Sequence, residues 1–204
     1  WLVHYFCDDA VLGNYMQASK LNQVVLLIPT LASFSLFPLV VTRLQEEMEV
    51  DIKLLKLASI YFYTSLIIST GIAICGYWLF PWLYGKSFSM MYEAFLLLVP
   101  GVLALSAAYP FSTYFAGKNA LKVNIAALAG SIGVLVMFDL ILIPSFGIRG
   151  AAAACSLAYI FFFLVLAYRF RRVHHFHWSQ LLKIRPIILE QWPLLFNKKN
   201  PDED

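Results

Sequence analysis

The sequence predicts an all-α membrane protein, built as a polytopic bundle of transmembrane helices. Its 204 residues are 61% hydrophobic and 13% charged, whereas charged residues make up about a quarter of soluble proteins. Five nearly uncharged stretches each contain roughly 19 or more residues, the length that about 30 Å of hydrocarbon requires of a helix. These runs are continuous rather than alternating, which excludes barrel strands. The expected spans are residues 21–41, 57–80, 94–116, 120–143 and 150–168.

The first span, 21–41, combines two prolines with a polar face. Pro29 and Pro38 each remove a backbone donor and bend the helix. Gln23, Thr30 and Ser33 are expected on one face, with Asn22 beside it. Because polar groups facing lipid are costly, this pattern favours a water-filled substrate cavity. The alternative is a helix whose hydroxyls bond back to their own carbonyls and whose amides lie at the interface.

Small residues recur at helical spacing in three of the spans. They are Ser65, Ser69, Ala73 and Gly76 in 57–80, Ala126, Ala129, Gly130 and Gly133 in 120–143, and Gly150 and Ala154 in 150–168. Such stripes let helix backbones approach closely, which is how helices associate where lipid removes the hydrophobic driving force. They predict a tightly packed bundle or, alternatively, sliding surfaces between moving helices.

Two acidic residues lie at or within the expected spans. Glu93 stands at the start of the third span, 94–116, and is expected at the membrane interface. Asp139 lies four residues before the end of the fourth span, about 6 Å inside it. A carboxylate there is expensive unless it is paired, protonated or hydrated, so Asp139 is a candidate coupling site. The structural alternative, which we favour, is an ion pair between Asp139 and Arg149.

A very short connection joins the fourth and fifth spans. Residues 140–154 read LILIPSFGIRGAAAA, in which a Pro-x-x-Gly-x-x-Gly turn closes one apolar segment and opens the next. The pattern predicts a helical hairpin whose connection is too short to hold a domain.

Basic residues are distributed unequally between the two sides of the membrane. If the five spans alternate, one side holds Lys20, Lys86 and Arg149, and the other holds the remaining twelve of the fifteen basic residues. The positive-inside rule places the second side, with the C-terminus, in the cytoplasm, as expected for a cell inner membrane. The net charge of +3 then reflects topology, with attraction to membrane lipids as a side effect. No soluble basic face remains for nucleic acid.

The two ends of the chain differ from the spans. Residues 1–7 are apolar and are typical of the end of a sixth, truncated span, so we expect a fragment with a further lobe upstream. Residues 1–172 form the transmembrane lobe, and residues 173–204 form a cytoplasmic amphipathic tail. His174, His175 and His177 lack an accompanying carboxylate or cysteine, which argues against a metal site. The three cysteines are odd in number and predict no disulfide framework.

Three stretches resemble motifs of polysaccharide flippases. Residues 11–21, VLGNYMQASKL, are similar to a Gly-x-Tyr-x-x-Ala-x-Lys-Leu segment that leads into a span, and residues 83–88, LYGKSF, to an outer Gly-x-x-Phe/Tyr loop. Residues 142–154, LIPSFGIRGAAAA, resemble a Leu-Ile-Pro-x-x-Gly-x-x-Gly-Ala-Ala hairpin, the most specific of the three. Over residues 8–172, the chain resembles the C-terminal half of an O-antigen-type flippase of the multidrug, oligosaccharidyl-lipid and polysaccharide exporter superfamily.

This resemblance implies one lobe of a two-lobed transporter, whose lobes rock about a central cavity. The substrate would be a polyprenyl-diphosphate-linked oligosaccharide, a lipopolysaccharide or exopolysaccharide precursor, moved from the inner to the outer leaflet by alternating access. A polar cavity would replace the water around the sugar headgroup while the lipid tail stays in the bilayer. The resemblance assigns no role to Asp139, because family members commonly carry Asn at that position.

Two other functions stay open at this point. One is a cation-coupled exporter of small molecules or drugs within the same superfamily. The other is a membrane-embedded enzyme of cell-envelope glycan synthesis, which needs placed acids or nucleophiles. The sequence contains no His-Glu-x-x-His, no Gly-x-Ser-x-Gly and no phosphate-binding glycine-rich loop. We therefore expect neither catalytic residues nor a cofactor.

The charge distribution yields a prediction about topology. With twelve basic residues against three, a reporter fused after Arg172 should be active only in the cytoplasm, and one inserted at Lys86 only outside. Paired alkaline phosphatase and green fluorescent protein fusions measure this. External activity of the fusion after Arg172 would contradict the orientation.

Overall fold

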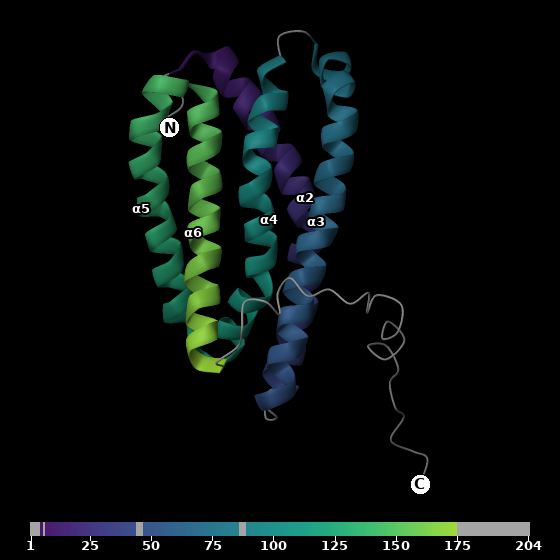
Figure 1. Ribbon diagram of the computed structural model, residues 1–204, viewed down its shortest axis with the longest axis vertical. Coiled ribbons are helices and arrows are strands. Elements are labelled where there is room, and N and C mark those ends of the chain that lie inside the picture. The colour runs from purple at the N-terminus through teal and green to yellow at the C-terminus, as the bar shows by residue number, and fades with distance from the viewer. Residues whose placement is uncertain (1–4, 6, 44–46, 86–88, 175–204) are drawn as a thin grey trace.

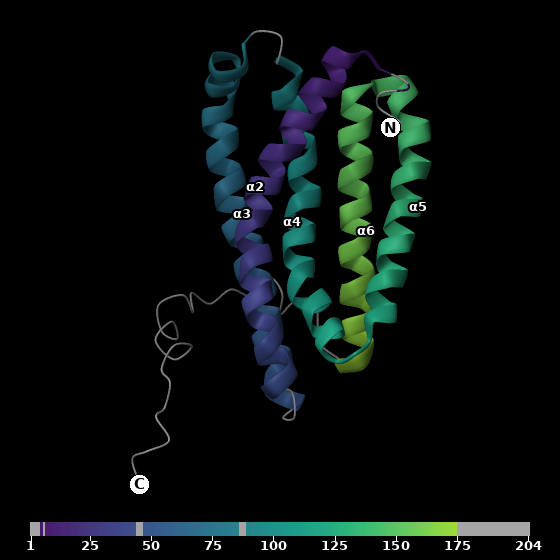
Figure 2. The ribbon, with the colours of Figure 1, turned by 180° about the vertical axis from the view of Figure 1, so that it is seen from behind.

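In the part of the chain that the structure describes, five long helices form a bundle and run alternately up and down (Figures 1 and 2). The computed structural model describes residues 5, 7–43, 47–85 and 89–174. Its helices are α2 (Asp9–Arg43), α3 (Glu47–Tyr84), α4 (Ser89–Gly117), α5 (Leu121–Phe146) and α6 (Ile148–His174). The described residues contain no strand. The predicted all-α class is confirmed.

Four of the helices are long and apolar enough to cross a membrane, by length and composition, so this is a multi-pass membrane protein. Within the described residues these spans are Leu54–Phe80, Met90–Gly117, Leu121–Phe146 and Ile148–Val173. The sequence predicted five spans, and four are found among the residues searched. The first expected span, 21–41, lies inside α2, and its last residues fall outside the side chains that the structure describes, so this span stays a prediction.

The central element of the bundle is α4, which contacts α2, α3 and α6 extensively. More than half of its apolar window is buried, whereas most of α5 faces outward. Pro100 and Pro110 lie inside α4, and each leaves a carbonyl of the preceding turn without its helical donor. In a membrane protein such a helix is tolerated where neighbouring helices satisfy the freed groups.

A close backbone approach joins α4 and α6 at Gly101 and Ser156. A Cβ atom on Gly101 would lie 2.5 Å from the Ser156 Cα, so only glycine fits at this position. The Ser156 hydroxyl donates a hydrogen bond to the Leu97 carbonyl and accepts one from the Gly101 N–H at 3.3 Å. A side chain of α6 therefore hydrogen bonds into the helical ladder of α4, directly after Pro100.

The hairpin predicted between the fourth and fifth spans is formed by α5 and α6. One residue, Gly147, separates the two helices, and its φ of 54° is in the left-handed region that favours glycine. Its N–H closes α5 by donating to the Ile143 carbonyl at 2.8 Å. Three residues later, a Cβ on Gly150 would lie 2.2 Å from the Leu142 carbonyl oxygen. Both glycines are therefore required by backbone geometry.

The small residues singled out in the sequence do not all mark close helix contacts. Gly130 packs against the ring of Phe161 on α6. A Cβ atom added at Gly133, in contrast, would have no neighbouring atom within 4 Å. Gly76 of α3 is covered by Phe80 of the same helix, since a Cβ there would lie 2.8 Å from that ring. Spacing alone identified the candidates, and only the rotation of each helix separates contact positions from lipid-facing ones.

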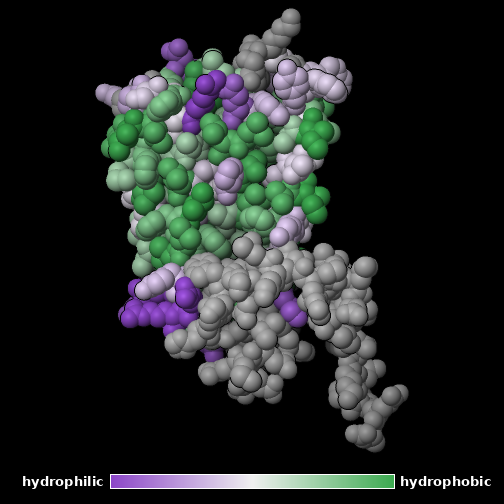
Figure 3. Space-filling view, in the orientation of Figure 1, coloured by the Kyte–Doolittle hydropathy of each residue, from purple (hydrophilic) through white to green (hydrophobic). Residues whose placement is uncertain are grey.

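The outer surface carries an apolar band between two polar ends (Figure 3). Large apolar side chains are exposed along α5, including Ile125, Ile132, Met137 and Ile141. A group of basic residues lies at the end of the bundle where α4 and α6 finish and α5 begins. They are Lys118, Lys122, Arg169, Arg171 and Arg172. An apolar belt of this kind matches the hydrocarbon of a bilayer, with charges kept at its edges.

The hairpin geometry predicts which glycine substitution is harmful. Gly150→Ala should destabilise the protein by about 1–3 kcal/mol through overpacking, because its methyl group would overlap the Leu142 carbonyl. This loss exceeds the gain of about 1 kcal/mol that alanine has over glycine in a helix. Gly133→Ala is the matched control and should be neutral or stabilising. Thermal unfolding of the full chain in detergent compares the two, and an equal Tm would contradict the prediction.

Candidate functional site

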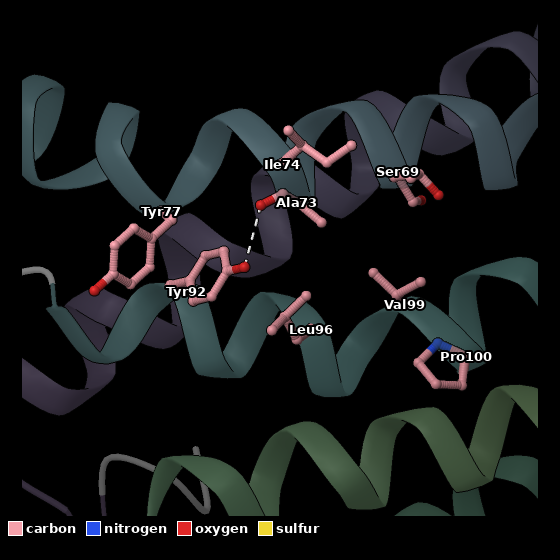
Figure 4. A pocket seen from close by; sticks show the side chains of 9 residues that line it. Ser69, Ala73, Ile74, Tyr77, Tyr92, Leu96, Val99 and Pro100 are labelled. Atoms are coloured by element: carbon pink, nitrogen blue, oxygen red, sulfur yellow. Dashed lines mark hydrogen bonds between the residues drawn. The ribbon is translucent and has the colours of Figure 1, made fainter.

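A groove lies between α3 and α4 on the described surface (Figure 4). Its volume is about 410 Å³. Apolar side chains and hydroxyls share its lining: Ser69, Thr70, Ala73, Ile74, Tyr77, Tyr92, Leu96, Val99 and Pro100. Ile74 and Tyr77 are largely exposed, so the groove opens onto the outer, lipid-facing surface of the bundle.

Small residues on α3 and a fixed tyrosine on α4 keep this groove open. Ala73 leaves space beside α4, and the nearby Phe80 ring lies back over Gly76 instead of filling that space. The Tyr92 hydroxyl donates to the Ala73 carbonyl at 3.1 Å. Its ring makes an edge contact with Tyr77, at a centroid distance of 5.8 Å. The groove therefore has a rigid aromatic end.

The polar residues predicted to line a cavity in α2 do not all share one face. Asn22 and Ser33 are buried, at 3% and 7% exposure, whereas Gln23 is exposed and Thr30 is half-buried. The buried face follows Ala18, Asn22, Val25, Pro29 and Ser33, with helical spacing. Gln23 and Thr30 lie within about 20° of each other around the helix, but Ser33 is turned about 80° from Gln23 and belongs to the buried face with Asn22.

Hydrogen bonds of these side chains stay within α2. The Asn22 amide nitrogen donates to the Ala18 carbonyl at 3.0 Å, and the Thr30 hydroxyl donates to the Leu26 carbonyl at 2.7 Å. Both bonds reach back four residues, which is the alternative considered for this helix. Among these four candidate side chains, Gln23 is the one whose amide is exposed on the outside of the bundle.

Hydroxyl oxygens line the buried side of α3 where it meets α2. Tyr61, Ser65 and Ser69 follow each other at four-residue spacing and are at most 5% exposed. Ser33 of α2 lies beside the Tyr61 hydroxyl. None of these four side-chain oxygens has a well-formed hydrogen bond to another described residue. Buried groups of this kind are commonly satisfied by ordered water, so this seam can hold water inside the lobe.

A second polar cluster joins α2 to α6. The hydroxyls of Tyr15 and Tyr159 both lie close to the Cys155 sulfur. Asp139 of α5 is close enough to interact electrostatically with Tyr15 and Cys155. The sequence predicted no disulfide framework for the three cysteines, and the position of Cys155 beside two tyrosines was not foreseen. The four-residue spacing of Cys155 and Tyr159 could have indicated half of this cluster.

The structure corrects the predicted partner of Arg149. Its Nε atom donates to Glu93 at 2.6 Å, so the ion pair joins α6 to the start of α4 and does not cross the hairpin to Asp139. Asp139 lies on α5, and its Oδ1 atom is buried without a hydrogen-bond partner in the described part of the chain. The physical reason is helix rotation: Arg149, at the start of α6, faces α4, which packs against α6.

The cysteines contribute no bridge in the described residues. Cys7, Cys75 and Cys155 are free. Burial and the neighbouring Asp8 carboxylate raise the pKa of the Cys7 thiol, which stays protonated at neutral pH. Within the searched ranges, no three side chains among histidine, cysteine and acidic residues come together to hold a metal ion.

Two regions discussed from the sequence lie outside the described residues. They are the first four residues, expected to end a sixth span, and 175–204, which make up nearly all of the amphipathic tail with His175 and His177. Lys86 and Phe88 of the second flippase-like motif also lie outside.

The groove was not foreseen from the sequence. Ser69 and Ala73 were noted as small residues that permit close packing, whereas in the structure they line a hollow. Tyr92 carried no signal, because its bond to the Ala73 backbone depends on two helices that the sequence does not orient.

Comparisons with known proteins leave the family open. No family model, no curated protein and no solved structure matches the chain. The functional argument therefore depends on the residues and their geometry.

The ion pair yields a prediction from a double-mutant cycle. Glu93→Gln and Arg149→Gln should couple by less than about 1 kcal/mol, because both side chains are about half exposed, at 46% and 61%.

Asp139→Asn should be neutral or stabilising, because it removes a carboxylate from a span where it has no described partner. Unfolding free energies of the single and double variants measure both effects. Loss of stability in Asp139→Asn that Arg149→Gln restores would contradict the assignment.

Proposed function

We propose that this chain forms one lobe of a flippase in the cell inner membrane, with its C-terminus in the cytoplasm. The lobe, together with a partner lobe, moves a polyprenyl-diphosphate-linked oligosaccharide from the inner to the outer leaflet by alternating access. The oligosaccharide is a precursor of lipopolysaccharide or exopolysaccharide.

The observation that carries this proposal is the hairpin at Gly147 and Gly150. The most specific of the flippase-like motifs requires a sharp turn between two spans, with glycines where the backbone leaves no room. The chain has a single-residue connection with positive φ at Gly147 and backbone contact at Gly150. The turn geometry at Gly147 and Gly150 thus supports the resemblance of this sequence segment to the flippase hairpin motif.

The polar path for a sugar headgroup is proposed to run along the outside of this lobe. The inward groups of α2, Asn22 and Ser33, are buried against the other helices and leave no space for a saccharide. Gln23 is exposed, about 100° around α2 from Asn22. It lies two residues inside the expected span 21–41, where an exposed amide is costly against lipid, which favours a second protein wall facing it across water. We therefore assign substrate contact to Gln23 and helix-internal roles to Asn22 and Thr30.

One observation favours a second candidate, a cation-coupled exporter of small molecules. Asp139 keeps a buried carboxylate oxygen without a described hydrogen-bond partner inside a span. Carboxylates in this situation commonly bind or release cations during transport. The two candidates differ in which molecule crosses the membrane. They differ also in whether transport requires a cation gradient that acts through Asp139.

The proposal predicts a specific effect of Gln23. In a flippase-deficient strain that carries both lobes, Gln23→Leu should reduce surface polysaccharide by about fivefold or more at normal protein level, since one lost polar contact to substrate is worth about 1–3 kcal/mol. Val24→Leu, a change at an exposed neighbour, is the control and should behave as wild type. Surface polysaccharide is measured by gel staining and protein level by immunoblot.

Two outcomes separate the candidates. Failure of both lobes together to restore surface polysaccharide would contradict flippase activity. Restored export of a small molecule that becomes independent of the cation gradient in Asp139→Asn would instead establish the second candidate.

A further inference from the structure

The groove between α3 and α4 extends from one end of the bundle toward the middle of the spans. Tyr92 and Pro100, at its two ends on α4, are eight residues apart, which corresponds to about 12 Å along a helix. Tyr77 and Tyr92 lie at the end nearer the α3–α4 connection, and Val99 and Pro100 lie at the deeper end (Figure 4). The groove is therefore an elongated track that runs into the membrane-spanning region.

The surface around this track faces the bilayer. Ile67 and Ile74 on α3 are 71% and 72% exposed, and both belong to a helix apolar enough to span. Toward the same end as the tyrosines, Trp78 and Trp82 are also strongly exposed. Exposed Trp and Tyr of this kind are typical of the membrane–water interface, at the level of lipid headgroups. The mouth of the track therefore lies near the headgroups and its floor lies in the hydrocarbon.

We propose that this groove holds one acyl chain of a membrane phospholipid, whose headgroup lies at the aromatic end. Most side chains along the track are apolar: Ile74, Leu96, Val99 and Pro100. The medium that surrounds this part of a membrane-spanning helix is the hydrocarbon of the lipid chains. Ser69 contributes to the groove mainly by being small, which deepens the floor. This site is independent of the proposed flippase activity.

The rigidity of the groove explains why a chain is retained there. The Tyr92 ring is held by the Ala73 carbonyl, by Tyr77 and by Phe80, whose ring centroid is 6.1 Å away. A preformed groove does not close when the acyl chain leaves. The groove side chains then lose their van der Waals contacts with that acyl chain. Because bulk lipid is equally apolar, retention depends on these dispersion contacts, each worth about 0.1–0.2 kcal/mol. We therefore expect selective but moderate retention.

The test is a groove-filling substitution with a matched control. The full chain is purified from membranes of phosphatidylethanolamine and phosphatidylglycerol, and retained phospholipid is counted by native mass spectrometry during detergent washing. Ala73→Leu should lower retention by about three- to tenfold, the effect of losing roughly 0.7–1.4 kcal/mol. Ala129→Leu makes the same change on the exposed face of α5 and should retain lipid as wild type does. Equal retention in the two variants would overturn the proposal.

Two further variants guard against ambiguous outcomes. If Ala73→Leu folds poorly, as judged by Tm, Ile74→Ala removes an exposed wall of the groove and should also lower retention. Ser69→Ala removes one hydroxyl from the groove without filling it, so phospholipid retention should be unchanged or higher. Loss of the retained molecule in Ser69→Ala, or recovery of a polyprenyl phosphate in place of phospholipid, would overturn the assignment to an acyl chain.

Discussion

The arrangement of the bundle depends on the contact between Gly101 of α4 and Ser156 of α6. Without a hydrophobic driving force between helices in lipid, association requires close packing and hydrogen bonds. Here both are present at one point, because the missing side chain of Gly101 admits the α6 backbone and the Ser156 hydroxyl bonds to the Leu97 carbonyl and the Gly101 N–H. Once α4 and α6 are joined in this register, the α5–α6 hairpin and the α4–α2 and α4–α3 contacts are placed around them.

The same contact adds hydrogen bonds to the turn of α4 that contains Pro100. Because Pro100 has no N–H, the carbonyl that lacks its helical donor is that of Leu96, four residues earlier. The Ser156 hydroxyl bonds instead to the Leu97 carbonyl and the Gly101 N–H, which are the next pair along the helix. Pro100 also forms the deep end of the α3–α4 groove.

Polar side chains inside the bundle differ in how fully they are paired. The Thr30 hydroxyl and the Asn22 amide nitrogen donate to carbonyls of their own helix. The amide oxygen of Asn22 and side-chain oxygens of Ser33, Tyr61 and Asp139 have no hydrogen-bond partner in the described residues. Such buried oxygens require water, a cation or a rearranged neighbour.

The sequence by itself determined the helical class, the bounds of most spans and the hairpin at Gly147. These are local properties: continuous apolar length decides whether a helix can cross a bilayer, and Gly147 is required by the backbone angle of the turn. The tertiary structure alone decided that Arg149 pairs with Glu93, that Gln23 faces away from Asn22's buried side, and that Ser69 and Ala73 line a groove. Each of these outcomes depends on how far one helix is rotated and shifted against its neighbour. That rotation is set by a few close backbone contacts, such as Gly101 on Ser156, which look the same in the sequence as glycines that touch nothing.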